Sequence, residues 1–179
     1  GFFRFQLTND DEPVVEELEF VRSTNNNTWG LGFNERGEVF GSTANGNPSV
    51  FMPIANRYYE AVRGWSAPQL GGIAESNDVH PITDKVRQVD HHGKFTAAAG
   101  HALYTARTYP KNYWKRAPFV TDPTGHLAAT FLLEKKGASY SSRIGWNLRT
   151  RVGAAIASLV GEGWSRAWME ATRGEGERE

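Results

Sequence analysis

One stretch decides the fold class of this chain: Thr28-Trp29-Gly30-Leu31-Gly32-Phe33-Asn34-Glu35-Arg36-Gly37-Glu38-Val39-Phe40-Gly41-Ser42-Thr43. Two short runs of apolar and small residues flank residues 34–37, and this spacing is typical of a β-hairpin. Gly37 supplies a residue that takes a positive φ at little cost in such a turn. The stretch therefore predicts a strand, a tight turn and a second strand that pairs antiparallel with the first.

Similar runs occur on both sides of this unit and continue as far as Trp146, at residues 2–7, 14–21, 86–89, 97–106, 117–121, 126–133 and 139–144. Turn residues at 122–125 and 135–137 separate the last of them. Repeated strand, turn, strand units favour a radial repeat such as a β-propeller, whose blades take about 40 residues each. We therefore predict an all-β fold, a partial antiparallel β-propeller of about three blades.

Two segments depart from the strand pattern. Residues 45–83 are rich in Gly, Pro, Asn and Ser, with one candidate helical turn at 55–63, so we expect a long loop excursion there. Residues 149–179 contain no Phe, Tyr, His or Pro, and their apolar residues recur at helical spacing, which predicts an appended helix at 151–172. We divide the chain into a propeller domain at 1–148 and a divergent tail at 149–179, which is helical, disordered or the product of a frameshift.

The composition excludes several classes of function. The 20 Lys and Arg residues balance the 20 Asp and Glu residues, so no net field attracts the chain to nucleic acid, and we expect no nucleic-acid partner. The absence of cysteine excludes disulfides, thiolate zinc sites and c-type haem attachment within these residues. The apolar runs are far shorter than the roughly 20 residues that cross a bilayer, so we expect no transmembrane segment.

Several motifs together resemble one known family. They are Thr28-Trp29-Gly30-Leu31-Gly32-Phe33, Gly41-Ser42-Thr43-Ala44-Asn45-Gly46, Asn56-Arg57-Tyr58-Tyr59-Glu60, His80-Pro81-Ile82-Thr83, Val86-Arg87-Gln88-Val89-Asp90, Phe95-Thr96-Ala97-Ala98-Ala99-Gly100-His101-Ala102-Leu103-Tyr104 and Asp122-Pro123-Thr124-Gly125-His126-Leu127. Over residues 2–148 the chain resembles the membrane-bound dehydrogenase propeller of planctomycete-type haem-binding proteins, which is distantly similar to glucose/sorbosone dehydrogenases and other quinoprotein propellers. The resemblance ends after Leu148.

The resemblance implies a fragment of an exported protein, periplasmic or extracellular, that oxidises a sugar or related small alcohol. It also implies pyrroloquinoline quinone and calcium as cofactors. The electron acceptor would be a haem domain with a Cys-x-x-Cys-His site, which these residues do not contain. We expect the fragment alone to be inactive, because an open propeller lacks the blades that complete an axial site.

Quinoprotein sugar dehydrogenases as a class use a histidine base, and arginines hold the cofactor carboxylates. The first candidate base is His101 and the second is His126, since each follows a glycine at the start of a predicted strand. The alternative is that both are structural histidines that bridge blades through hydrogen bonds. Arg57 and Arg87 are the candidates for cofactor binding, and we assign no metal ligands.

The polar residues before the strand at 28–33 are a candidate carbohydrate surface. Asn27 offers amide groups for hydrogen bonds, and Trp29 offers an indole face that can stack on a sugar. Tyr58 adds a second ring. The alternative is a polar turn in which Trp29 anchors the packing between blades.

Two other functions stay open at this stage. One is a non-catalytic propeller that binds carbohydrate or protein, its likeness to dehydrogenases reflecting the fold alone. The other is a calcium-dependent lactonase-like hydrolase, for which the available carboxylates are Asp78, Asp84, Asp90 and Asp122. The side chains on the axis distinguish the three: histidine with arginines favours a quinone, a ring of carboxylates and amides favours calcium, and neither favours binding.

The catalytic assignment predicts a specific effect of substitution in the complete protein. His101→Gln is expected to lower sugar-dependent turnover by about 10²- to 10⁴-fold, the contribution of a general base, while thermal stability changes little. His126→Gln is the comparison and is expected to cost less. Full turnover of the His101→Gln variant, or loss of its fold in thermal melting, would overturn the assignment.

Overall fold

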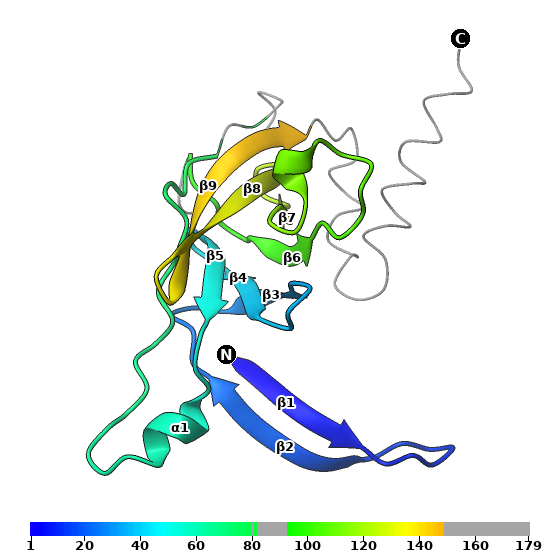
Figure 1. The fold of residues 1–179 in the computed structure, drawn as a ribbon, viewed down its shortest axis with the longest axis vertical. Helices are drawn as coiled ribbons and strands as arrows, with labels where there is room; N and C mark the ends of the chain where they lie inside the picture. The colour runs from blue at the N-terminus through cyan, green and yellow to red at the C-terminus, as the bar shows by residue number, and fades with distance from the viewer. Residues whose placement is uncertain (80, 82–92, 149–179) are drawn as a thin grey trace.

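The structure is a computed structural model that describes residues 1–79, 81 and 93–148, and its regular elements are almost all antiparallel strands (Figure 1). The first sheet is a hairpin of β1 (Phe2–Leu7) and β2 (Val15–Arg22). The second contains β3 (Thr28–Phe33), β4 (Val39–Thr43) and β5 (Asn47–Met52). The third contains β6 (Ala99–Leu103), β7 (Pro118–Asp122), β8 (Leu127–Lys136) and β9 (Ser139–Leu148).

The three sheets confirm the predicted all-β fold. In each sheet the strands pair in chain order, so the chain forms a hairpin followed by two antiparallel meanders, an arrangement like part of a β-propeller. The only helices among the described residues are two short ones, α1 (Asn56–Glu60) and the 3₁₀ turn η1 (Lys111–Tyr113). No described helix is long and apolar enough to cross a membrane. The predicted strand at 86–89 and the predicted helix at 151–172 lie outside the described residues.

The hairpin predicted for residues 28–43 is present. β3 pairs with β4, with Leu31 opposite Gly41, and Gly37 in the turn has a φ of 75°. The Asn34 Oδ1 atom accepts hydrogen bonds from the backbone N–H groups of Arg36 and Glu38, at 2.9 and 3.0 Å. The side chain of Asn34 therefore fixes the turn that joins the two strands.

The prediction of a long loop excursion at 45–83 is wrong at its beginning, where β5 forms, whereas the candidate helical turn at 55–63 contains α1. Asn45 and Gly46 have φ values of 56° and 80°, so they make the tight turn that returns β4 into β5. Pro48 is tolerated in β5 because this strand is at the edge of its sheet. The composition of this segment concealed the strand, although the Asn-Gly pair is a recognised hairpin signal.

Three apolar clusters hold the sheets together. The first joins the hairpin to the second sheet and contains Phe2, Val21, Val50 and Leu70. The second lies between the second and third sheets, where Phe40, Phe51 and Leu133 are buried and Tyr140 packs against both rings. The third lies within the third sheet and its loops, and includes Phe95, Val120, Leu127 and Phe131. The second sheet is therefore packed on both of its neighbours.

Glycines allow β3 to pack directly on β6. A Cβ atom on Gly32 would overlap the backbone carbonyl of His101, and one on Gly30 would overlap the carbonyl of Gly100. Ser42 in β4 strengthens the same contact, because its Oγ atom lies 2.9 Å from the carbonyl oxygens of Ala98 and Gly100. The second and third sheets thus meet backbone to backbone.

We predict that Gly32→Ala destabilises the fold by about 1–3 kcal/mol or more, because the added methyl group meets a backbone carbonyl that cannot move without β6. The matched control is Gly71→Ala, where a Cβ atom would have nothing within 4 Å. Urea unfolding followed by tryptophan fluorescence measures both. Equal midpoints for the two variants would contradict this account of the interface.

Candidate functional site

His101 lies in the interior, where the second and third sheets meet. Its side chain is 1% exposed, and its ring stacks on Phe40 with a centroid separation of 5.6 Å and an interplanar angle of 4°. The Nε2 atom lies 3.0 Å from Ser49 Oγ in β5. The hydrogen bond between these atoms joins two sheets, as expected for a structural histidine that bridges blades.

Burial lowers the pKa of His101 to about 3, because the charged imidazolium loses its hydration inside the protein. The ring is therefore neutral at neutral pH. Its Nδ1 atom is buried and has no partner in a neighbouring described residue. The imidazole does not reach solvent in this arrangement, and its catalytic role stays a prediction.

The other predicted groups that the structure describes, His126, Asp122 and Asp78, have contacts of their own away from the His101 ring. His126 is partly buried in the turn between β7 and β8, with a φ of 53°. Asp122 is fully buried and accepts hydrogen bonds from the backbone N–H groups of Thr96, Ala97 and Thr124, so it fixes loops. Asp78 forms an exposed ion pair with Lys94. Arg87, Asp84 and Asp90 lie outside the described residues.

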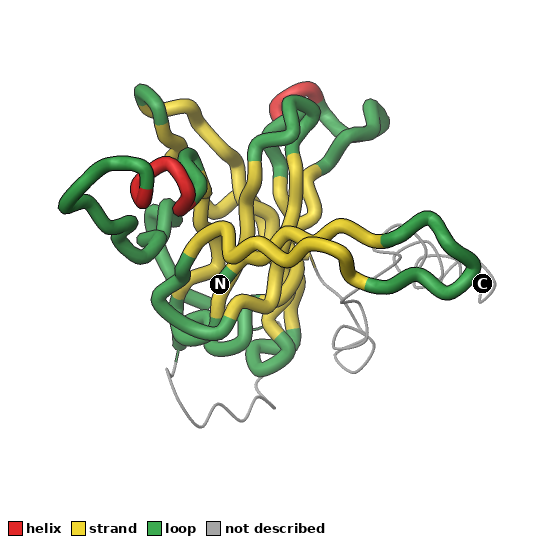
Figure 2. The backbone as a smooth tube through the Cα atoms, turned by 90° about the horizontal axis from the view of Figure 1, so that it is seen from below, coloured by secondary structure: helices red, strands yellow, loops and turns green. Residues whose placement is uncertain are grey.

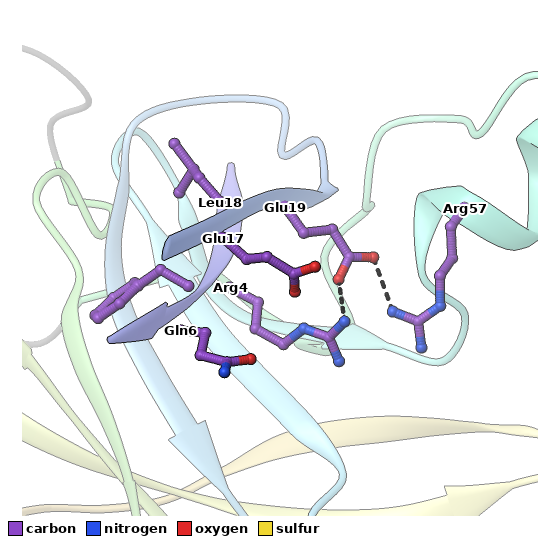
Figure 3. A pocket seen from close by; sticks show the side chains of 7 residues that line it. Arg4, Gln6, Glu17, Leu18, Glu19 and Arg57 are labelled. Carbon is purple, nitrogen blue, oxygen red and sulfur yellow. Dashed lines mark hydrogen bonds and ion pairs between the residues drawn. The ribbon is translucent and has the colours of Figure 1, made fainter. Parts of the chain in front are cut away.

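A pocket of about 700 Å³ lies beside the hairpin and α1. Arg4, Phe5 and Gln6 line it from β1; Glu17, Leu18 and Glu19 line it from β2; and Arg57 lines it from α1 (Figure 3). Arg4 is opposite Glu19 and Gln6 is opposite Glu17 in the strand pairing, so these four polar side chains share one face of the hairpin. The pocket therefore combines hydrogen-bond donors, acceptors and apolar atoms.

Glu19 connects the two arginines of the pocket. Its Oε1 atom lies 2.8 Å from Arg57 Nη1, and its Oε2 atom lies 2.5 Å from Arg4 Nη2 (Figure 3). The hydrogen bond from Arg57 lowers the pKa of Glu19, and the charge of Arg4 acts in the same direction, so the carboxylate stays ionised. A guanidinium has five N–H donors, so both arginines keep donors that a ligand can use.

The structure places one predicted residue in the lining of this pocket, a second beside it and two elsewhere. Arg57 lines it, and the adjacent Tyr58 is 59% exposed with its ring 4.8 Å from the Arg57 guanidinium. Asn27 and Trp29 are exposed near the start of β3 and do not line the pocket. The sequence argument missed Arg4, Gln6, Glu17 and Glu19, because only the strand register shows that they lie together.

Among the described residues, no group of three or more His, Cys, Asp or Glu side chains is arranged to hold a metal ion. The carboxylates and guanidiniums of the pocket are one place where charged groups converge; Glu35, paired with Arg107 and Lys115, is another. Such groups suit hydroxyl-rich organic ligands, because they form paired hydrogen bonds in defined directions.

The buried state of His101 predicts a pH dependence of stability. Its pKa is about 6.5 in the unfolded chain and about 3 in the folded chain, so between these values only the unfolded chain binds the proton. Stability should therefore fall as the pH is lowered from 7 to 4, by up to about 1.4 kcal/mol per pH unit.

His101→Gln should remove this slope. In place of the small change in stability expected from the sequence, the variant should also be less stable at pH 7, since it loses the buried ring stacked on Phe40. Burial raises the pKa of Asp122, which acts in the opposite direction but is common to both proteins. Urea unfolding at pH 7, 6, 5 and 4 measures the difference. Parallel curves for the two proteins would show that His101 is not buried as described.

Comparison with known proteins identifies a family for this chain, but it assigns no activity. No curated protein and no solved structure matches the chain. Residues 1–149 match a domain of unknown function, DUF7133. Because this match covers most of the sequence, including every described strand, the chain belongs to the DUF7133 family.

Proposed function

We propose that the domain binds carbohydrate, without chemistry of its own, in the pocket between the β1–β2 hairpin and α1. The observation that carries the proposal is the lining of this pocket by two arginines, two glutamates and a glutamine beside exposed apolar groups. Its volume of about 700 Å³ is within the usual range of small-ligand sites, roughly 300–1,000 Å³.

The polar groups suit the hydroxyl groups of a sugar. Carboxylates such as that of Glu17 accept hydrogen bonds from hydroxyl hydrogens, and guanidiniums donate to hydroxyl oxygens. The Arg4–Glu19–Arg57 ion pairs hold three of these groups in place before a ligand arrives. A site that is already ordered loses less conformational entropy on binding.

Apolar and aromatic groups next to the polar ones complete the match. Phe5 and Leu18 also line the pocket, although their side chains belong to the opposite face of the hairpin, and the ring of Tyr58 lies exposed beside Arg57. Sugar rings have C–H faces that pack against such surfaces while their hydroxyl groups bind at the edge.

The dehydrogenase implied by resemblance is a second proposal. The observation in its favour is the buried Nδ1 atom of His101, which has no partner in a neighbouring described residue. Against it, His101 is buried between sheets while Arg57 lines an exposed pocket, so the candidate base and the one candidate cofactor-binding arginine that the structure describes are not at one site. The described residues therefore do not fit a quinone, and we derive no reaction step through one. Sugar-dependent dye reduction by the complete protein, titrated with pyrroloquinoline quinone and calcium, tests this proposal.

The carbohydrate proposal is tested by screening the protein against a panel of neutral and acidic saccharides, followed by calorimetric titration with those that bind. Arg57→Ala should weaken binding by about 10- to 100-fold, because a hydrogen bond to a charged group contributes about 1.5–3 kcal/mol. Glu17→Gln should weaken binding in the same direction, since the charge on the acceptor is lost.

Arg63→Ala is the matched control, because Arg63 is an exposed arginine of the segment after α1 that does not line the pocket. Thermal melting establishes that the variants fold. Absence of saccharide binding, or equal loss of affinity in Arg57→Ala and Arg63→Ala, would refute the proposal.

A further inference from the structure

The β1–β2 hairpin has a face that is entirely apolar and exposed. The strand pairing sets Phe3 opposite Phe20, Phe5 opposite Leu18 and Leu7 opposite Val15, so these six side chains share one face. Their exposed fractions are between 43% and 68%. The hairpin projects from the remainder of the described chain, as both views show (Figures 1 and 2).

The size of this face exceeds what a soluble monomer usually exposes. A large side chain offers roughly 150–250 Å² when fully exposed, so at these fractions the six residues present on the order of 600 Å² of apolar surface. Contiguous apolar patches of more than a few hundred Å² mark interaction sites. A two-stranded sheet is also marginally stable by itself, so covering one face stabilises the hairpin.

We propose that this face, formed by Phe3, Phe5, Leu7, Val15, Leu18 and Phe20, packs on the same face of a second copy of the chain. An apolar face without a charged residue requires an apolar partner, and its own copy presents a surface of equal size and kind. Two copies related by a twofold axis would stack their hairpins as facing sheets, about 10 Å apart.

The area that would be buried and the net charge of the chain are both compatible with a second copy as the partner. Covering about 600 Å² on each copy buries about 1,200 Å² in total, which reaches the lower limit of stable interfaces. The formal net charge is +0 at pH 7, so two copies meet without long-range repulsion. The charged side chains of the hairpin, including Arg4 and Glu19, lie on the other face and do not oppose the contact.

Sedimentation velocity of the full chain over a concentration series tests the proposal. We expect a reversible dimer, and we expect Phe3→Lys to raise its dissociation constant by about 100-fold or more, because two like charges would enter an apolar interface. Phe33→Lys is the matched control, since Phe33 is 55% exposed on β3 and lies outside the proposed interface. Neither Phe3 nor Phe33 lines the carbohydrate pocket, whereas Phe5 and Leu18 belong to both surfaces. Saccharide titration of Phe3→Lys therefore shows whether the dimer can be lost while the pocket still binds.

A second measurement uses the absence of cysteine from the chain. In Phe20→Cys, the rate at which a maleimide reacts with the new thiol should fall as the protein concentration rises, whereas the rate in Phe33→Cys should not change. A monomer at all concentrations would overturn the proposal. So would a dimer that Phe3→Lys leaves intact while the variant stays folded, or a thiol at position 20 whose reactivity is independent of concentration.

Discussion

Where β3 packs on β6, the two backbones touch with no side chain between them, because Gly30 and Gly32 lack the Cβ atoms that would separate them. This contact sets how the second sheet meets the third. With the backbones this close, Phe40 and Phe51 reach Leu133 and Tyr140 in the next sheet, and Ser49 reaches the ring of His101. The inter-sheet core therefore depends on two positions that carry no side chain.

The Gly-His pair that made His101 a candidate base has a backbone explanation. Gly100 has a φ of 69°, so the glycine before the histidine is required by the backbone at this point of β6. The glycine of a Gly-His pair at a strand start reflects the need for a positive φ. It does not indicate whether the imidazole of the histidine faces solvent. Here the neighbouring sheet covers the ring, which stacks on Phe40 and lies within hydrogen-bond distance of Ser49, and the catalytic role of His101 stays a prediction.

Turn residues and apolar runs in the sequence correctly predicted those strands and turns whose geometry depends only on residues close by in the chain. The Asn34 to Gly37 turn and its two strands are examples, because their geometry follows from turn residues between apolar runs. The strand β5 was missed because a composition rich in Gly, Pro and Asn was interpreted as a loop. The Asn45-Gly46 pair that precedes this strand is nevertheless typical of a hairpin turn, and both residues have a positive φ. Arg57 and Tyr58 were identified as candidates, but Glu19, the ion-pair partner of Arg57, is 38 residues away in the sequence, and only the fold brings the two together.

The candidate site depends on the alternation of side chains between the two faces of a strand. Because side chains alternate along β1 and β2, the sequence of apolar and polar residues divides the hairpin into a charged face and an apolar face. The charged face is held by Glu19 between two arginines, one of which comes from α1, so the helix and the hairpin support each other. Phe5 and Leu18 contribute to the pocket wall and also belong to the apolar face. Contact at the apolar face would therefore order the strands that carry the pocket, which makes the two surfaces of this small hairpin energetically coupled.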